Sequence, residues 1–172
     1  MRAGLLACLL VVSAPLTAAQ AEAPGEPSVR YLSRMGIDLA KAGFEVAARE
    51  GRVPGDLSTC IANADREPLR AAMRTLMAAE FTPEEILQID AYLASSAAEK
   101  DWVNADRRMR AIVGLPSEPV VPISDAERAV IEAFLEHDLW DRLMAMVGGS
   151  QGQPLHPELK RVMVDMRGRC SR

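Results

Sequence analysis

Side chains that commonly carry catalysis or hold metals are scarce in this sequence. Its 172 residues include two histidines and three cysteines, and aromatic residues make up 4%. His137 and His156 lie far apart and lack the His-x-x-x-His spacing of a helical zinc site. We expect a solvent-exposed or packing role for His137 and a loop or helix-capping role for His156. Because nucleotide-binding and nucleophile motifs are also missing, we expect no catalytic, cofactor-binding or metal-binding residues and a protein that is not an enzyme.

Basic side chains are outnumbered by acidic ones. The net charge is -4 and the sequence pI is about 5.3. A protein that binds the phosphate backbone needs a basic face, so nucleic acid is not an expected partner. Glycine and proline number 11 each without a fixed period, which excludes a collagen-like or low-complexity chain. The length fits one globular domain.

Long apolar runs are confined to the N-terminus. Residues 1–21 combine Arg2, an apolar run over 4–12 and a small-residue tail, which is the pattern of a secretory signal peptide. The run is shorter than the roughly 20 residues that span a bilayer, and no later stretch approaches that length. We therefore expect no membrane span after cleavage. Cleavage after Ala21 is favoured, and cleavage after Ala19 is the alternative.

Loss of the signal peptide would leave 151 residues with 24 acidic and 19 basic side chains. Arginine outnumbers lysine 17 to 3, a composition typical of a high-GC bacterial genome. We therefore expect the protein in the periplasm of a Gram-negative bacterium. Residues 22–28 contain two prolines and a glycine and are expected to form a flexible leader. A single helical domain is expected over 29–172.

Two cysteines, Cys60 and Cys170, would remain in the mature chain, because Cys8 leaves with the signal peptide. An even number of cysteines in an oxidising compartment predicts a disulfide. Closing this loop would stabilise the fold by about 4–5 kcal/mol in the chain-entropy model. Two unpaired thiols are the alternative, since Cys170 lies near the carboxyl terminus, where chains fray.

Apolar periodicity predicts helices and no strands. We expect helices over Val29–Gly51, around Cys60 and Ile61, over Pro68–Glu80, from Pro83 past Val103 with any break near Asn104, over Asp125–Val147, and over Pro157–Cys170. Prolines make 115–122 a semi-rigid linker. The fold class is all-α, a bundle of about five to six helices in two packed helical hairpins. On the helix after Ser124, the expected buried residues include Val130, Ile131, Phe134 and Leu135.

Two helix starts carry capping boxes. Thr82 with Glu85, and Ser124 with Glu127, place a hydroxyl at the N-cap and a carboxylate three residues later. A shift of 42 residues aligns the two boxes and the apolar residues after them, which predicts a pseudo-repeat of two hairpins. The alternative is that any two capped amphipathic helices look alike.

Residues 81–100 resemble the signature of the bacterial domain of unknown function 2059. Its Phe-Thr-x-Glu-Glu-Leu start resembles 81–86, where Ile86 stands for the leucine. In its Phe-Tyr-x-Ser-Pro-x-Gly-x-Lys segment, Tyr92 and Leu93 take the aromatic pair, and Ser95 and Lys100 match. Ser96 and Ala98 replace its proline and glycine, so we expect the helix here to run on without a bend. The resemblance, with a core over 69–147, implies an exported helical protein and no established activity.

Two further patterns have structural and functional interpretations. Methionine pairs such as Met73/Met77 could hold copper(I), but their helical spacing favours core packing. The basic cluster Arg107-Arg108-Met109-Arg110 could meet an anionic partner, but it suits a solvated helix C-terminus better.

These observations favour a binding function over chemistry. The leading hypothesis is a periplasmic helical binding or accessory protein that offers a protein partner a groove between the two capped hairpins, with a homodimer as a further option. A periplasmic inhibitor or immunity protein that binds a hydrolase or toxin is the alternative. An uncharacterised enzyme is the third hypothesis, which would need a pocket holding a histidine beside a carboxylate.

Overall fold

The computed structural model describes residues 23–148 and 154–171. Within these ranges the chain is all-helical, as predicted, with eight helices instead of five or six. The helices are α1 (Glu26–Arg49), α2 (Leu57–Ala62), α3 (Glu67–Glu80), α4 (Pro83–Leu93), α5 (Ser96–Ile112), α6 (Asp125–Leu135), α7 (Asp138–Val147) and α8 (Pro157–Cys170). The predicted signal peptide and its cleavage sites lie outside the described residues.

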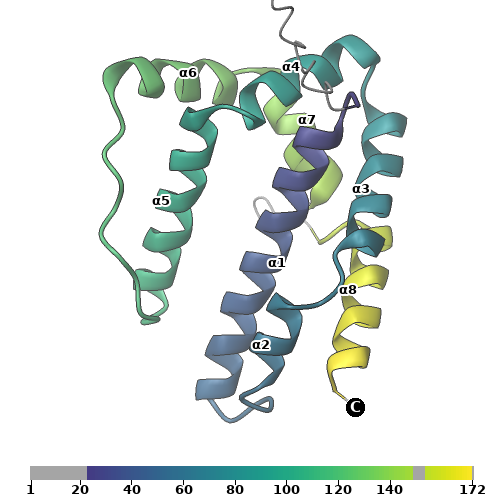
Figure 1. Cartoon of the computed structure of the whole chain (residues 1–172), viewed down its shortest axis with the longest axis vertical. Coiled ribbons are helices and arrows are strands. Elements are labelled where there is room, and N and C mark those ends of the chain that lie inside the picture. Colours follow the sequence, from purple (N-terminus) through teal and green to yellow (C-terminus); the bar gives the residue numbers. More distant parts are fainter. Residues whose placement is uncertain (1–22, 149–153, 172) are drawn as a thin grey trace, which may run out of the picture.

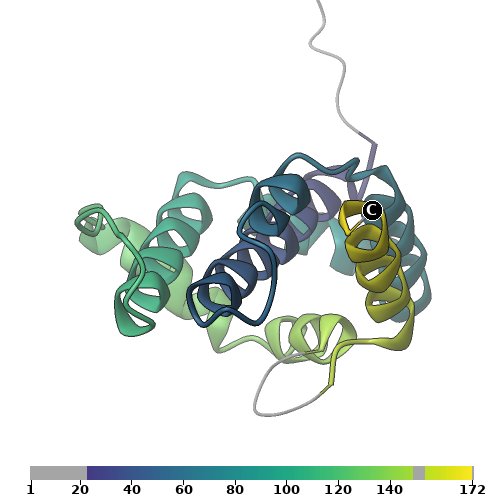
Figure 2. The same cartoon turned by 90° about the horizontal axis from the view of Figure 1, so that it is seen from below.

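Helix α1 is the central element of the bundle and packs against α2, α3, α4 and α5 (Figure 1). Helix α8 lies along α3 and α2, on the far side of α1 from α5 (Figure 2). Helices α4 and α6 lie across one end of the molecule, and α7 leads from that end toward α8 (Figure 1). This end of the molecule carries both predicted capping boxes.

The start of α1 corrects the predicted flexible leader. The helix begins at Glu26, three residues before Val29, and Ser28 is fully buried. Its N-terminus is capped from a distant helix, because the Asp90 carboxylate on α4 accepts hydrogen bonds from the amides of Gly25 (2.6 Å) and Ser28 (3.0 Å). The Ser28 hydroxyl also donates to Asp90. Residues 25–28 are therefore anchored in the bundle.

Two predicted long helices are each broken once. The first ends at Leu93 and restarts at Ser96, and the second ends at Leu135 and restarts at Asp138. Each break has a local cap: the Ser95 hydroxyl accepts a hydrogen bond from the amide of Ala98 (3.1 Å). In the second break, Nδ1 of His137 accepts a hydrogen bond from the amide of Leu139 (3.1 Å). The expectation that Ser96 and Ala98 allow a straight helix is therefore wrong.

Asn104, where a break was expected, lies buried inside α5. Its side chain donates to the carbonyl of Val121 (2.8 Å) and accepts from the amide of Val121 (2.6 Å). This two-way bond fixes the extended connection between α5 and α6 along the side of α5. The predicted break at Asn104 is therefore wrong, and its side-chain amide instead binds the backbone of a loop that returns past the helix.

The core joins side chains from all eight helices, and the disulfide closes it. Met73, Met77 and Met166 are buried among leucines and isoleucines, so the core-packing interpretation of these methionines is confirmed. Cys60 on α2 is bonded to Cys170 at the end of α8, with Cα atoms 5.7 Å apart. The predicted pairing is present and ties the last helix to the second.

Burial on α6 differs from the prediction. Of the four residues expected to be buried there, only Ile131 is buried, and Phe134 is half-buried. The side chains of Val130 and Leu135 are exposed, at 47% and 38%. The reason is the position of the helix, which packs mainly against α5 and α7 at the edge of the bundle. Its amphipathic pattern therefore leaves apolar side chains at the surface.

Candidate functional site

An apolar groove lies between the two capped helices, where a binding groove was expected. Side chains of α4, α6 and the start of α7 line a hollow of about 400 Å³. The lining residues are Gln88, Ala91, Tyr92, Val130, Ala133, Phe134, His137 and Leu139. Most of them are apolar and several are exposed, so the groove is open to solvent. Pockets lined by apolar residues with a few polar groups are the usual form of ligand sites.

Stacked aromatic rings contribute to the lining of the groove. The Tyr92 and Phe134 rings are stacked with centroids 3.9 Å apart and planes 12° apart. Trp140 meets Phe134 edge-on, with centroids 6.1 Å apart. Burial, with a smaller effect from Asp101, raises the pKa of Tyr92 to about 12, so the phenol stays neutral at physiological pH. Phe81, just before α4, lies under Arg142 of α7 in a cation–π contact of 4.8 Å. Four of the few aromatic side chains therefore gather at this end of the molecule.

The capping boxes begin α4 and α6, and they also link two helical hairpins, which we define as α4 with α5 and α6 with α7. Both predicted boxes form: the Thr82 and Ser124 hydroxyls accept from the amides of Glu85 and Glu127, and each glutamate accepts from its N-cap amide. Glu127 also binds Lys100 on α5 at 2.7 Å, while Glu85 binds Arg142 on α7 at 2.6 Å.

These two ion pairs are reciprocal. Lys100 and Arg142 are 42 residues apart, as are Glu85 and Glu127, so each capping glutamate binds a cation on the second helix of the other hairpin. Helices α4 and α6 also have equal lengths at this offset. This correspondence agrees with the predicted pseudo-repeat, which stays a prediction because unrelated capped helices share such features.

The ion pairs change the pKa values of both glutamates. The hydrogen bond from Lys100, followed by those from Ser124, lowers the pKa of Glu127 to about 2. Arg142, followed by the Thr82 amide, lowers the pKa of Glu85. Both carboxylates are therefore ionised at neutral pH, and Lys100 and Arg142 balance their charge locally, so the negative potential around the groove comes from the other, exposed carboxylates.

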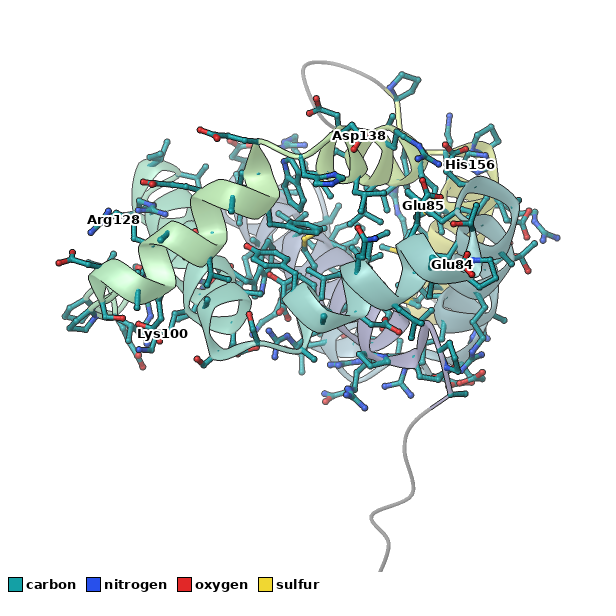
Figure 3. All side chains as sticks on the ribbon, turned by 90° about the horizontal axis from the view of Figure 1, so that it is seen from above. Glu84, Glu85, Lys100, Arg128, Asp138 and His156 are labelled. Carbon is teal, nitrogen blue, oxygen red and sulfur yellow. A yellow bond between two sulfur atoms is a disulfide. The ribbon has the colours of Figure 1, made fainter. Side chains whose placement is uncertain are left out.

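The surface around the groove is strongly acidic. We define the acidic end as residues 82–94 and 124–138, which carry eight acidic side chains and one basic side chain, a net charge of -7. Glu84, Asp125, Glu132, Glu136 and Asp138 are exposed there. Figure 3 looks onto this end and places Glu84 on one side of it and Arg128 on the other. An apolar groove with an acidic surround suits a cationic amphipathic ligand.

The two histidines both cap helices. His137 Nδ1 accepts from the amide of Leu139 at 3.1 Å and caps α7, and its ring lines the groove. His156 Nδ1 accepts from the amide of Glu158 at 3.2 Å, which confirms its expected capping role at α8. The capping role of His137 was missed, because sequence reasoning placed it inside a continuous helix.

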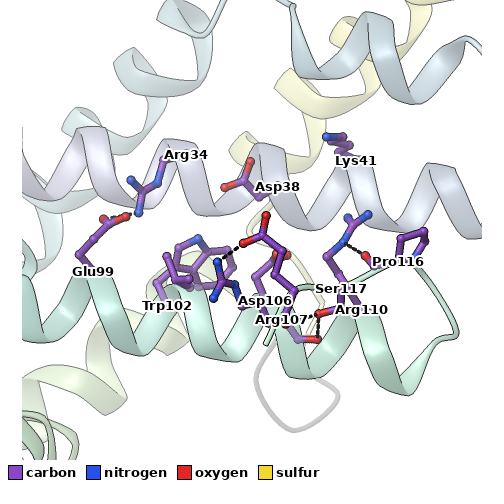
Figure 4. A pocket seen from close by; sticks show the side chains of 12 residues that line it. Arg34, Asp38, Lys41, Glu99, Trp102, Asp106, Arg107, Arg110, Pro116 and Ser117 are labelled. Carbon is purple, nitrogen blue, oxygen red and sulfur yellow. Dashed lines mark hydrogen bonds and ion pairs between the residues drawn. The ribbon is translucent and has the colours of Figure 1, made fainter. Parts of the chain in front are cut away.

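The basic cluster at the end of α5 holds the connection to α6. Arg107 donates to the carbonyl of Pro119 and pairs with Glu118, while Arg110 donates to the carbonyl of Pro116 at 3.0 Å and pairs with Glu45 at 2.8 Å. These bonds surround a charged hollow of about 480 Å³ between α1 and α5 (Figure 4). The cluster was expected to be solvated; instead two of its arginines bind the chain that follows them.

The structure shows a helical, disulfide-bonded protein with an open apolar groove at one end. Comparison with protein-family models, with curated protein sequences and with solved structures found no match for this chain. The resemblance to the domain of unknown function 2059 therefore stays a prediction. Among the described helices, none combines the length and hydropathy that crossing a membrane requires.

Proposed function

We propose that this chain is an exported accessory protein that binds a cationic amphipathic helix of a partner protein in the groove between α4 and α6. The observation that carries this proposal is the apolar hollow of about 400 Å³ set in an end of net charge -7. A helix that lays its apolar face into the groove would bring its basic flanks against the exposed carboxylates.

Export is supported by two independent features. Residues 1–21 have the composition of a signal peptide, and the Cys60–Cys170 bond suits an oxidising compartment such as the periplasm. The partner would then be another exported protein or the exported segment of a membrane protein.

A second copy of this chain is a poorer occupant of the groove. A two-fold dimer formed through this surface would bring two acidic ends of net charge -7 against each other. Like charges at an interface oppose association, so the charge distribution favours a basic partner over self-association.

The proposal is tested with the mature chain, residues 22–172, and a labelled amphipathic peptide of about 18 residues made of leucine and lysine. Fluorescence anisotropy should show binding that weakens as salt rises, because the charged flanks are screened. Ala133→Arg, which fills the groove and adds a positive charge, should weaken binding by roughly tenfold or more.

Three controls make the test specific. Ala79→Arg adds the same side chain at an exposed position of α3 and should leave binding unchanged. A peptide of the same composition without helical periodicity, and a leucine–glutamate peptide, should bind much more weakly. Equal binding of all three peptides, or an Ala133→Arg variant that binds like the unmodified protein, would show that the groove is not the binding site.

A further inference from the structure

A third hollow, separate from the groove and sharing Arg34 and Glu99 with the hollow of Figure 4, is lined by arginines. It has a volume of about 590 Å³ and lies among the first turns of α1, the start of α3 and the turn between α4 and α5. Its lining consists of Pro27, Arg30, Tyr31, Arg34, Arg66, Arg70, Leu93, Ala94, Ser95, Ser96 and Glu99. Four arginines from two helical segments thus converge on one space.

The charges facing this hollow are mostly positive. Glu99 is its one acidic lining residue and is paired with Arg34 at 2.6 Å. Glu26 interacts electrostatically with Arg30 and Arg70, but its carboxylate forms its ion pair with Arg74. Beside the Arg34–Glu99 pair the lining carries two further cations, Arg66 and Arg70, in a chain whose net charge is negative.

One of these arginines has an unsatisfied donor. Arg70 Nε is buried and has no hydrogen-bond partner among the described residues. A guanidinium keeps its proton at any physiological pH, so a buried N–H without an acceptor costs free energy. Because Nε has almost no accessible surface, a ligand in the hollow would contact Arg70 through its terminal Nη groups.

The start of α5 adds to the attraction for an anion. Ser95 and Ser96 line the hollow, and they begin a helix of 17 residues. The free amides and the dipole at a helix N-terminus favour negative charge. Alone this feature would not define a site, but here it faces the same hollow as the four arginines.

We propose that this hollow binds a small phosphate monoester. Planar guanidinium groups bind phosphate oxygens in pairs, and several of them can contact one phosphate. The hollow is larger than a phosphate ion needs, and the side chains of Pro27, Tyr31 and Leu93 can contact an organic group attached to it. The proposal is independent of the groove between α4 and α6.

Calorimetric titration of the mature chain tests this proposal, with inorganic phosphate and phenyl phosphate as probes at fixed ionic strength. We expect saturable binding of both, tighter for phenyl phosphate. The double variant Arg66→Gln/Arg70→Gln should bind roughly tenfold more weakly or worse, because it removes two charged donors. Arg161→Gln/Arg169→Gln on the exposed side of α8 is the matched control and should bind like the unmodified protein.

A second variant guards against misfolding of the first. Ala94 is exposed at the hollow, so Ala94→Glu places a carboxylate there without disturbing the core and should also weaken binding. Ala78→Glu on α3 is its control. Absence of saturable binding by the unmodified protein, or equal weakening by the control variants, would overturn the proposal.

A vesicle sedimentation experiment distinguishes a soluble phosphate monoester from the phosphate headgroup of a lipid. Phosphatidylcholine vesicles with and without phosphatidic acid are mixed with the protein and sedimented. Binding of phenyl phosphate without sedimentation assigns a soluble ligand, whereas sedimentation that depends on phosphatidic acid and on Arg66 and Arg70 assigns a lipid headgroup. Sedimentation that persists in Arg66→Gln/Arg70→Gln would contradict a role of the hollow in binding vesicles.

Discussion

Asp90 links two parts of the chain through one carboxylate. It is 8% exposed, sits on α4, and accepts hydrogen bonds at the start of α1, more than 60 residues earlier. The acceptor satisfies amides that would otherwise be buried without a partner at the helix N-terminus. The same contact fixes Pro27 and Arg30, which line the proposed phosphate site.

Replacement of Asp90 should therefore destabilise the fold. Asp90→Ala leaves the Gly25 and Ser28 amides without an acceptor and should lower the free energy of unfolding by about 1–3 kcal/mol. Asp90→Asn keeps one oxygen and should lose less. Urea unfolding measures both, with Asp165→Ala on the exposed face of α8 as the control. An Asp90→Ala variant as stable as that control would contradict the capping role.

The helices around the groove are linked by their capping glutamates. Glu85 and Glu127 each complete a local box and also bind a cation on another helix. Their lowered pKa values mean that ionisation stabilises the folded state, and this contribution is fully present above the ordinary carboxyl pKa near 4.5. The contribution of Glu127 is lost as pH falls through about 2, and that of Glu85 as pH falls through its own lowered pKa.

Acid should therefore weaken the fold partly through these two residues. In Glu85→Gln/Glu127→Gln the loss of stability between about pH 4.5 and 2 should be shallower than in the unmodified protein, and the two curves should converge at the acid end. Urea midpoints measured across this range check the slope. Glu84→Gln/Glu132→Gln changes exposed neighbours and should keep the original slope. Identical slopes for all three proteins would refute the assignment.

Features that depend on residues close together in the sequence could be predicted from it. The capping boxes at Thr82 and Ser124 were predicted because hydroxyl and carboxylate lie three residues apart. The breaks at Ser95 and His137 were missed, since apolar periodicity continues across them. The roles of Asp90 and Asn104 could not be predicted, because each binds backbone from a distant segment, and one sequence does not reveal which segments meet.

At the scale of the molecule, the negative charge is concentrated at one end, and the disulfide lies elsewhere in the molecule. The acidic end carries a net charge of -7 while the whole chain carries -4, so the rest of the chain is net positive by 3. The disulfide lies away from the groove and joins α2 to the end of α8, with a sequence separation of 110 residues. Most of the described chain, including both hairpins, lies between these cysteines and is thus enclosed in one covalent loop.

Breaking this bond should cost much of the stability without removing the groove. Reduction, or Cys60→Ser/Cys170→Ser, should lower the free energy of unfolding by about 2–5 kcal/mol and speed amide exchange first in α8. Denaturant unfolding with and without reductant measures the effect, and the double variant should not respond to reductant. If reductant leaves the unmodified protein's midpoint unchanged, the bond does not stabilise the fold.

The reciprocal pairing of Glu85 with Arg142 and of Glu127 with Lys100 has the form of an isologous contact, in which each side offers the other the same groups. In a homodimer both sides would be identical, and a ligand could lie across them in either direction. Here one chain supplies both sides, so Tyr92 can face Phe134 and Ser95 can correspond to His137. The two walls are unequal, and a helix bound between them would have one preferred direction.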